Sequence, residues 1–340
     1  MWYEYFLDRG LIPFLLVKYF INRLNGLTDT KLKKSTEEDR SNFSNLISQG
    51  PIAYDTEVAN QQHYEVTSEF FQSILGPRLK YSSCFWDEST SNLEDAEIKM
   101  LNMYIERCEI RGGLSVLDLG CGWGSVTLYL AEKFPDSKFT CLSNSETQIK
   151  YIKTICNEKN LDNVTAIKSD INDFAPQQKF DRVISIEMFE HMHNLKELFK
   201  RISLWMTPDA ILFIHVFSHK DTPYFFLDEK SWMAKHFFRS GLMPSYDLFD
   251  NFSEELLLTQ SWLINGTHYQ RTLDEWEKRL RSNKQEILKI FQKGVDKKHS
   301  LILWRRWRIF LAACSSLFGF NSGDVWFVAH HKFRLRETHE

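Results

Sequence analysis

The chain has 340 residues, of which 43% are hydrophobic and 26% are charged. This composition is that of a globular protein, long enough for one large domain or for a core domain with an added layer. The formal net charge of -3 argues against nucleic acid as the main partner, because proteins that bind nucleic acid carry an excess of positive charge. Aromatic residues are abundant, with 27 Phe, 12 Tyr and 10 Trp, which suits a pocket for an apolar or aromatic substrate.

The six cysteines form no Cys-x-x-Cys pair, so we predict no metal site. Several of them lie within apolar patterns, as buried thiols do. Reduced thiols are typical of a reducing compartment, and we therefore predict a cytoplasmic protein.

The first 56 residues are predicted to form a unit of their own, ahead of one domain over residues 57–340. Residues 1–26 are typical of helices interrupted by Gly10 and Pro13, and residues 27–50, rich in Thr, Lys, Ser and Glu, are typical of a mobile polar linker. The longest uncharged run near the start, residues 10–17, is too short to span a membrane. We expect an amphipathic helical cap without stable membrane insertion; weak membrane association is the alternative.

Apolar periodicity then predicts alternating helices and strands. Helices are expected near residues 70–75 and over 93–108, 126–134, 145–158 and 195–206; strands are expected over 116–119, 138–142, 164–168, 180–186 and 210–216. This alternation predicts a doubly wound parallel sheet. The aromatic-rich segment 219–250 is expected to be an inserted helical lid. Strands over 256–264 and 325–331, with helices over 272–292 and 299–318 between them, complete the domain.

Three glycines at alternate positions follow the strand over 116–119, in the sequence VLDLGCGWGS of residues 116–125. Gly120, Gly122 and Gly124 predict a sharp turn where the backbone approaches a ligand. Their spacing differs from the Gly-x-Gly-x-x-Gly of dinucleotide folds and from a phosphate-binding loop that ends in Lys-Ser/Thr. The turn resembles the first motif of S-adenosylmethionine-dependent methyltransferases of the Rossmann-like class, so S-adenosyl-L-methionine is the predicted cofactor.

Three further motifs make the resemblance narrower: NQQHYE at residues 60–65, LKYSSCFW at 79–86 and SIEMFEHM at 185–192. Over about residues 50–335 the chain resembles the superfamily of cyclopropane fatty acid synthases, mycolic acid methyltransferases and plant coclaurine N-methyltransferases, and most of all the last. The resemblance implies a class I methyltransferase fold: a seven-stranded, mostly parallel sheet with an N-terminal helical cap and an inserted lid at about 219–250.

The resemblance also implies a cofactor site. The three glycines would let the backbone approach the methionine half, while Asp118 would order the loop. Tyr81 and Ser82 resemble residues that close over the methionine carboxylate, Asn144 and Gln148 would hold the ribose, and Asp170 and Ile171 would frame the adenine.

The SIEMFEHM motif supplies candidate catalytic residues for methyl transfer to an amine. An amine is protonated at neutral pH, so the site must attract the ammonium ion, remove its proton and exclude water. Glu187, Glu190 and His191 have the spacing i, i+3 and i+4, and share one face if the segment is helical. Two carboxylates can bind the cation, and His191 is the candidate general base. Alternatively, Glu190 and His191 only order the helix below.

Residues for the substrate are expected after the fifth strand and in the lid, although many of the lid aromatics have core packing as their alternative. Facing rings can surround an apolar amine and stabilise its charge. Tyr269 is the expected polar contact from the late region, and Trp326 is expected in the wall or the core. The predicted substrate residues are His215, Phe217, His219, Phe225, Phe226, Trp232, Phe237, Tyr269 and Trp326.

The predicted function is therefore N-methylation of an aromatic, largely apolar amine; a homodimer is left open. The alternative is a lipid-modifying enzyme that methylates or cyclopropanates an acyl double bond. Cyclopropane synthases hold a bicarbonate ion, and their ligands align here with Ser83, Glu190, His215, Phe217 and Tyr269. Ser83 replaces a cysteine (with Cys84 adjacent, so that a shift by one residue stays open), and Phe217 replaces an aliphatic residue. Lipid-modifying members carry Gly at position 187, where N-methyltransferases carry Glu. A third alternative is a cofactor-binding protein without catalysis.

Overall fold

A seven-stranded sheet forms the centre of the computed structural model, which describes residues 3–54, 67–226, 232–237, 241–252 and 254–336. The strand order is β3-β2-β1-β4-β5-β9-β8; the first five strands are parallel to one another, and β9 pairs antiparallel with both β5 and β8. This sheet confirms the predicted fold class. The strands are β1 (Ser115–Leu119), β2 (Lys138–Ser143), β3 (Val164–Lys168), β4 (Phe180–Ile186), β5 (Met206–His219), β8 (Leu256–Ile264) and β9 (Trp326–Leu335).

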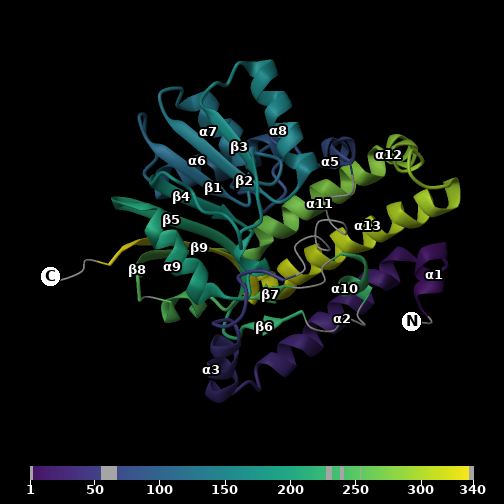
Figure 1. Cartoon of the computed structure of the whole chain (residues 1–340). Coiled ribbons are helices and arrows are strands. Elements are labelled where there is room, and N and C mark those ends of the chain that lie inside the picture. Colours follow the sequence, from purple (N-terminus) through teal and green to yellow (C-terminus); the bar gives the residue numbers. More distant parts are fainter. Residues whose placement is uncertain (1–2, 55–66, 227–231, 238–240, 253, 337–340) are drawn as a thin grey trace.

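Both faces of the sheet are covered, so its middle strands are buried on both sides. Along β1 the side chain of Val116 belongs to one hydrophobic cluster and that of Leu117 to the other, because successive side chains of a strand point to opposite faces. Helices α5 (Ser68–Ile74), α6 (Leu93–Arg107) and α7 (Ser125–Lys133) contribute to the first cluster, and α9 (Leu195–Trp205) to the second. Helix α8 (Glu146–Lys159) lies beside β2 and β3 (Figure 1).

Strand β5 begins four residues earlier than the sequence analysis expects, at Met206, and so includes Pro208. The pairing register with β4 shifts between Phe180 and Arg182. A proline cannot donate to a regular ladder, but an irregularity of this kind accommodates it.

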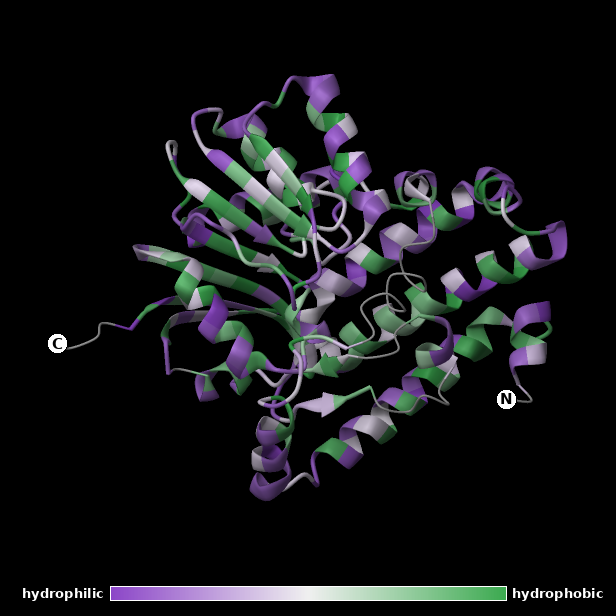
Figure 2. Ribbon diagram, in the orientation of Figure 1, coloured by the Kyte–Doolittle hydropathy of each residue, from purple (hydrophilic) through white to green (hydrophobic). Residues whose placement is uncertain are grey.

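Three helices between β8 and β9 form a layer beside the sheet: α11 (Gly266–Ser282), α12 (Lys284–Phe291) and α13 (Lys297–Phe318). Helices α1 (Glu4–Arg9) and α2 (Phe14–Leu32) pack along α13 (Figure 1). In Figure 2 these helices carry both hydrophobic and hydrophilic residues, as expected for helices with one buried face.

The polar linker expected over residues 27–50 is largely helical instead. Helix α2 continues to Leu32, and α3 covers Glu37–Leu46. Thr36 and Asp39 form a reciprocal capping box at the start of α3, which satisfies two otherwise free backbone N–H groups. Phe43 then buries itself against Phe225. The cap and this contact explain why so polar a segment is helical.

The outer face of α2 carries exposed apolar side chains, including Leu15 at 80% exposure. In the described part of the chain, no helix combines the length and the apolar character that crossing a membrane requires.

The segment expected to be a helical lid contains a small antiparallel sheet as well as helix. Strands β6 (Tyr224–Phe225) and β7 (Leu242–Met243) pair with each other. Between them lies helix α10 (Trp232–His236), and the 3-10 turn η2 (Leu248–Asn251) follows. Another 3-10 turn, η3 (Phe320–Gly323), precedes β9.

Candidate active site

The glycine loop lies between β1 and α7, at the carboxyl end of the parallel sheet. Gly120, Gly122 and Gly124 all adopt a positive φ, at 76°, 52° and 80°. A side chain on Gly120 would meet Met188 at 2.7 Å, whereas one on Gly122 would meet none of the described residues within 4 Å. The loop therefore needs glycine at position 120 for packing, and at position 122 it faces a space that the described residues leave open to a ligand.

Four buried polar side-chain atoms around this loop have no hydrogen-bond partner in the described structure: Asp118 Oδ1, Trp123 Nε1, Ser125 Oγ and Gln148 Nε2. Buried polar atoms are normally paired, so this group points to a ligand. Burial raises the pKa of Asp118 to about 6, against the opposing hydrogen bond that Thr127 donates at 2.7 Å. The donors and acceptor fit the polar methionine and ribose parts of S-adenosylmethionine.

The end of β2 orients the predicted ribose residues. The Ser143 hydroxyl donates to Gln148 Oε1 at 2.7 Å, and the Ser145 side chain caps α8 by accepting from the Gln148 amide. The side-chain nitrogen of Gln148, Nε2, has no partner among the described residues and is left as a donor for a ligand. Asn144 lies in the same turn. This arrangement is compatible with the predicted role of both residues.

The end of β3 forms a compact polar turn. Asp170 Oδ1 accepts from both the backbone and the side chain of Asn172, and Ile171 is buried. Asn172 also accepts from the amides of Ile52 and Ala53. The turn thus ties the segment before residue 55 to the edge of the predicted adenine site.

Tyr81 and Ser82 come from the segment between α5 and α6. Tyr81 packs between Phe71 and Trp276. Ser82 accepts a hydrogen bond from Lys80, whose ammonium also donates to the Ser83 carbonyl at 2.7 Å. Lys80 is fully buried, and burial lowers its pKa. The NQQHYE motif at residues 60–65 lies outside the described residues.

Glu187 directly follows β4 and has a positive φ of 50°, which is uncommon for a residue with a side chain. Its Oε1 accepts from the Ser83 amide at 2.9 Å and from His215 Nε2 at 3.2 Å; its Oε2 accepts from the Tyr269 hydroxyl at 2.7 Å. Burial alone would raise the pKa of Glu187, but the bond from His215 and the charge of Lys80 outweigh burial and lower it. Glu187 is therefore an ionised carboxylate in a buried position.

Glu190 and His191 lie on a single 3-10 turn, η1 (Phe189–His191), which Glu187 precedes. The three residues thus do not share one face of an α-helix, because the left-handed backbone conformation at Glu187 changes the direction of the chain before the 3-10 turn begins. Glu190 is fully buried: its Oε1 accepts from the Phe217 amide at 2.8 Å, and its Oε2 has no partner in the described structure. Burial, then repulsion from Glu187, raise the pKa of Glu190 well above its usual value. Burial lowers the pKa of His191 to about 4, so its imidazole is neutral at pH 7.

Five of the predicted substrate residues, together with Tyr224 and Phe318, form a continuous series of aromatic contacts that reaches Glu187 at Tyr269. Tyr269 stacks on Phe318, which contacts Phe217, and Phe217 contacts Phe226. Tyr224 packs against Phe226, and its hydroxyl accepts a hydrogen bond from the Trp326 indole N–H. His219 packs on Trp326. We call this set the aromatic wall: Phe217, His219, Tyr224, Phe226, Tyr269, Phe318 and Trp326.

The other three predicted lid residues pack elsewhere. Phe225 lies on the strand face opposite Tyr224, against Phe43 and His193. Phe237 stacks on Phe310 of α13 and also contacts Trp232. These contacts correspond to core packing, the alternative given for the lid aromatics.

Four residues of this region were not predicted from the sequence: Lys80, Tyr104, Arg107 and His330. Tyr104 and His330 both contact His215 at 2.8 Å, and Arg107 contacts His330. Only the pairing of β5 with β9 brings His215 and His330 together.

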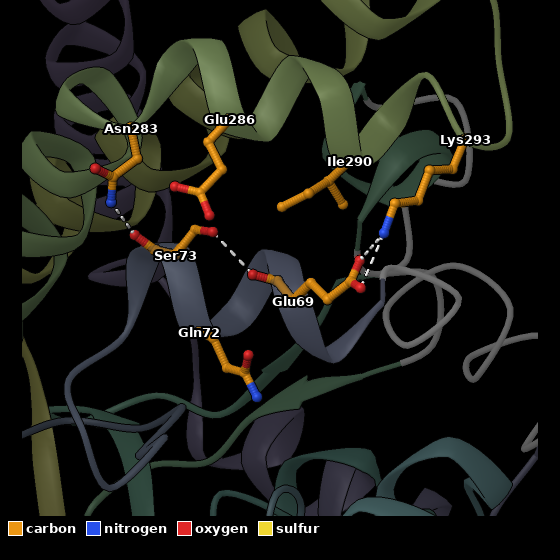
Figure 3. A pocket seen from close by; sticks show the side chains of 7 residues that line it. All are labelled: Glu69, Gln72, Ser73, Asn283, Glu286, Ile290 and Lys293. Carbon is orange, nitrogen blue, oxygen red and sulfur yellow. Dashed lines mark hydrogen bonds and ion pairs between the residues drawn. The ribbon is translucent and has the colours of Figure 1, made fainter.

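A separate surface cavity of about 390 Å³ lies between α5 and α12 (Figure 3). Its described lining includes the ion pair of Lys293 and Glu69. None of the predicted site residues lines it, so it is distinct from the candidate active site.

The model of the mycolic acid cyclopropane synthetase family matches residues 54–328. The chain belongs to this family. Among its curated relatives, (S)-coclaurine N-methyltransferase of Thalictrum flavum subsp. glaucum is 34% identical over 97% of this chain and 94% of its own length. Cyclopropane-fatty-acyl-phospholipid synthase of Escherichia coli (strain K12) is 29% identical over 80% of this chain and 67% of its own length.

Solved structures agree with this assignment. A crystal structure of coclaurine N-methyltransferase bound to N-methylheliamine and SAH has a TM-score of 0.92, is 34% identical, and covers 97% of this chain and 98% of its own. A cyclopropane synthase from Mycobacterium tuberculosis has a TM-score of 0.72 at 22% identity, covering 83% and 99%, and shares the fold. The predicted family and enzyme class are confirmed: this chain is an S-adenosylmethionine-dependent methyltransferase.

Proposed function

We propose that this enzyme methylates the nitrogen of an aromatic, largely apolar amine, of the kind that coclaurine N-methyltransferase acts on. The named substrate class of the relatives supports the proposal, and so do the residues around Glu187. S-adenosylmethionine supplies the electrophilic methyl group when bound; the chain must bring a neutral amine to it.

The hydrogen bonds of Glu187 carry the proposal. Its carboxylate accepts from Ser83, His215 and Tyr269, three of the five positions that the resemblance aligns with bicarbonate ligands. The carboxylate of Glu187 thus uses the donors that a bicarbonate ion needs. A resident carboxylate in this place supports chemistry that needs a fixed anion beside the acceptor, rather than an exchangeable base.

An ammonium ion fits this fixed anion. A carboxylate offers about four acceptor sites, and the bonds to Ser83, His215 and Tyr269 leave room for one more partner. Attraction to Glu187 positions the cation, and the aromatic wall beside it excludes water and offers ring faces to an apolar cation.

The neutral imidazole of His191 is the proposed acceptor of the amine proton. Burial lowers its pKa to about 4 even though the charge of Glu187 opposes this effect, so the imidazole is a weak base before the amine binds. Desolvation of the ammonium ion makes that ion a stronger acid and so favours the transfer. Burial and the charge of Glu187 raise the pKa of Glu190 well above its usual value, so its carboxyl takes up a proton more readily than an exposed one. A cation nearby would lower that pKa, so Glu190 can adjust its charge when the amine binds.

Lipid modification is the second candidate, because Glu190, His215 and Tyr269 agree with the bicarbonate-binding pattern. In this chain, however, His215 and Tyr269 are both hydrogen-bonded to the Glu187 carboxylate, and the Phe217 amide donates to Glu190. The alternative therefore requires Glu187 to release both residues.

The test is transfer of labelled methyl from S-adenosylmethionine to two sets of acceptors, each with and without bicarbonate. One set holds tetrahydroisoquinolines and phenethylamines, and the other holds vesicles of unsaturated phospholipid. We expect label in the amines, independent of bicarbonate. Label in the lipid that depends on bicarbonate would overturn the proposal.

A further inference from the structure

A directed chain of hydrogen bonds links Glu187 to a cation that does not touch it. His215 Nε2 lies 3.2 Å from Glu187 Oε1, His330 Nε2 lies 2.8 Å from His215 Nδ1, and the Arg107 guanidinium contacts His330 Nδ1. His215 and His330 are paired residues of β5 and β9, and both are fully buried. Arg107 is half-buried at the end of α6, with its guanidinium over the Trp262 ring.

The chemistry of Arg107 sets the direction of this chain. A guanidinium only donates hydrogen bonds, so His330 Nδ1 must accept. Burial lowers the pKa of both histidines, to about 4 for His215 and well below the usual value for His330, so each carries a single ring proton. The proton of His330 is therefore on Nε2 and is donated to His215 Nδ1. The proton of His215 is then on Nε2 and is donated to Glu187.

We propose that His330 is a positioning residue of this enzyme: held by Arg107, it fixes the His215 tautomer that donates to Glu187. The inference rests on the proposed role of Glu187 as the anchor for the ammonium ion. Without His330, the His215 proton can move to Nδ1, where the Tyr104 oxygen can accept it. The His215 Nε2 lone pair would then face a carboxylate oxygen, which disfavours the ionised form of Glu187.

Replacement of His330 by Phe tests the tautomer directly. His330→Phe keeps an aromatic ring but loses both nitrogens, whereas His330→Gln keeps an N–H donor and an acceptor. His331 offers a matched control: it is the adjacent residue of β9, is equally buried, and shares a hydrogen bond with the Ser261 hydroxyl on the other face of the sheet. Nitrogen NMR of labelled histidine reports which ring nitrogen carries the proton in the full chain.

We expect His215 to carry its proton on Nε2 in the native chain and in His331→Phe, and to lose this preference in His330→Phe. For a tetrahydroisoquinoline acceptor, kcat/KM should fall about 10- to 50-fold in His330→Phe, the size expected for losing a hydrogen bond to a charged group. In His330→Gln it should fall less than about threefold. The affinity for S-adenosylhomocysteine should change in neither.

The pH profile separates positioning from a structural defect. In His330→Phe the acidic limb of kcat/KM should move to higher pH, because Glu187 then ionises less readily. The titratable groups near Glu187 are Lys80 and Cys84 before α6, Tyr104 on α6, Glu190 and His191 on η1, His215 on β5, Tyr269 on α11 and Cys314 on α13. A general loss of folding would lower activity at every pH and would be shared by His331→Phe.

The inference is overturned if His330→Phe leaves the His215 proton on Nε2, or if His330→Gln and His331→Phe lose as much activity as His330→Phe. The NMR result does not depend on any substrate. If the tautomer changes as expected but the native chain methylates no amine, the role of His330 in fixing the His215 tautomer is supported and the proposed function is wrong.

Discussion

Glu187 is the residue on which the proposed chemistry depends most. Its carboxylate is ionised although buried, because three donors and the charge of Lys80 stabilise it. Glu187→Gln keeps the shape and removes the charge. Hydrogen bonds to charged groups contribute about 1.5–3 kcal/mol, so we expect kcat/KM for an amine to fall roughly 10- to 100-fold. Binding of S-adenosylhomocysteine, measured by calorimetry, should stay within about twofold.

Equal losses of amine turnover and of cofactor affinity in Glu187→Gln would contradict this role. They would mean that Glu187 only supports the fold of the site, through Ser83 and Tyr269.

His191 is predicted to matter most where the amine is protonated. The pKa of His191 is about 4, so its imidazole is neutral at pH 6 and above, and its own titration does not shape the profile there. As the pH rises, more of the amine is neutral without help. We expect His191→Ala to lower kcat on the order of 100-fold at pH 7 and progressively less toward pH 10. The measurement is kcat against pH for both enzymes; a deficit independent of pH would exclude the base role.

The sequence indicated which residues of the candidate catalytic motif lie together, but not the residues that surround them. Glu187, Glu190 and His191 lie in one continuous stretch that follows a strand, so their proximity could be inferred from spacing. His330 is 115 residues from His215 in sequence, and only the antiparallel pairing of β5 with β9 joins them. Lys80 precedes the recognised Tyr81, but nothing in its sequence context indicates that its ammonium is buried.

At the scale of elements, the glycine loop between β1 and α7 uses its glycines in two ways: Gly120 makes room for a neighbouring side chain, and Gly122 leaves space for a ligand. An alanine at Gly122 would meet no atom of the described residues within 4 Å, although its φ of 52° disfavours a side chain. The left-handed conformation costs roughly 1–2 kcal/mol for such a residue. We expect Gly122→Ala to fold and to weaken S-adenosylhomocysteine binding more than about tenfold, because its methyl group enters the open space. Gly120→Ala should lower the melting temperature more, since its methyl group would meet Met188 at 2.7 Å.

Thermal melts and cofactor titrations of both glycine variants decide between these effects. Unchanged cofactor affinity in folded Gly122→Ala would show that the open space at this loop does not receive the cofactor.

The strands of the central sheet were more predictable than the elements outside it. The inner strands β1 and β4 are short, largely apolar runs before a turn, because they are buried on both faces. Helix α3 was missed because its residues are polar, although the spacing of Thr36 and Asp39 is itself a helix-start signal. Strands β6 and β7 have only two residues each, so their pairing depends on contacts that no local pattern reports.

At the scale of the whole molecule, the cofactor site costs stability when it is empty. Asp118 is buried, one of its oxygens has no partner among the described residues, and burial raises its pKa to about 6. A folded-state pKa above the unfolded value means that folding favours the protonated form. Stability is therefore lost as the pH rises from about 4 to 6, and the full cost, on the order of 1–3 kcal/mol, applies above pH 6.

Asp118→Asn removes this charge and keeps an oxygen that can accept from Thr127. We expect the variant to be more stable than the native chain at pH 8 and no more stable at pH 4, measured by denaturant unfolding. S-adenosylhomocysteine should stabilise the native chain by about 2.7 kcal/mol at a hundred times its Kd. At the same concentration it should stabilise Asp118→Asn less, because the cofactor no longer meets a carboxylate. If Asp118→Asn is less stable at pH 8 but binds the ligand normally, Asp118 serves the fold and not the cofactor. If Asp118→Asn is more stable at pH 8 but binds the ligand more weakly, the charge of Asp118 destabilises the fold and serves to bind the ligand.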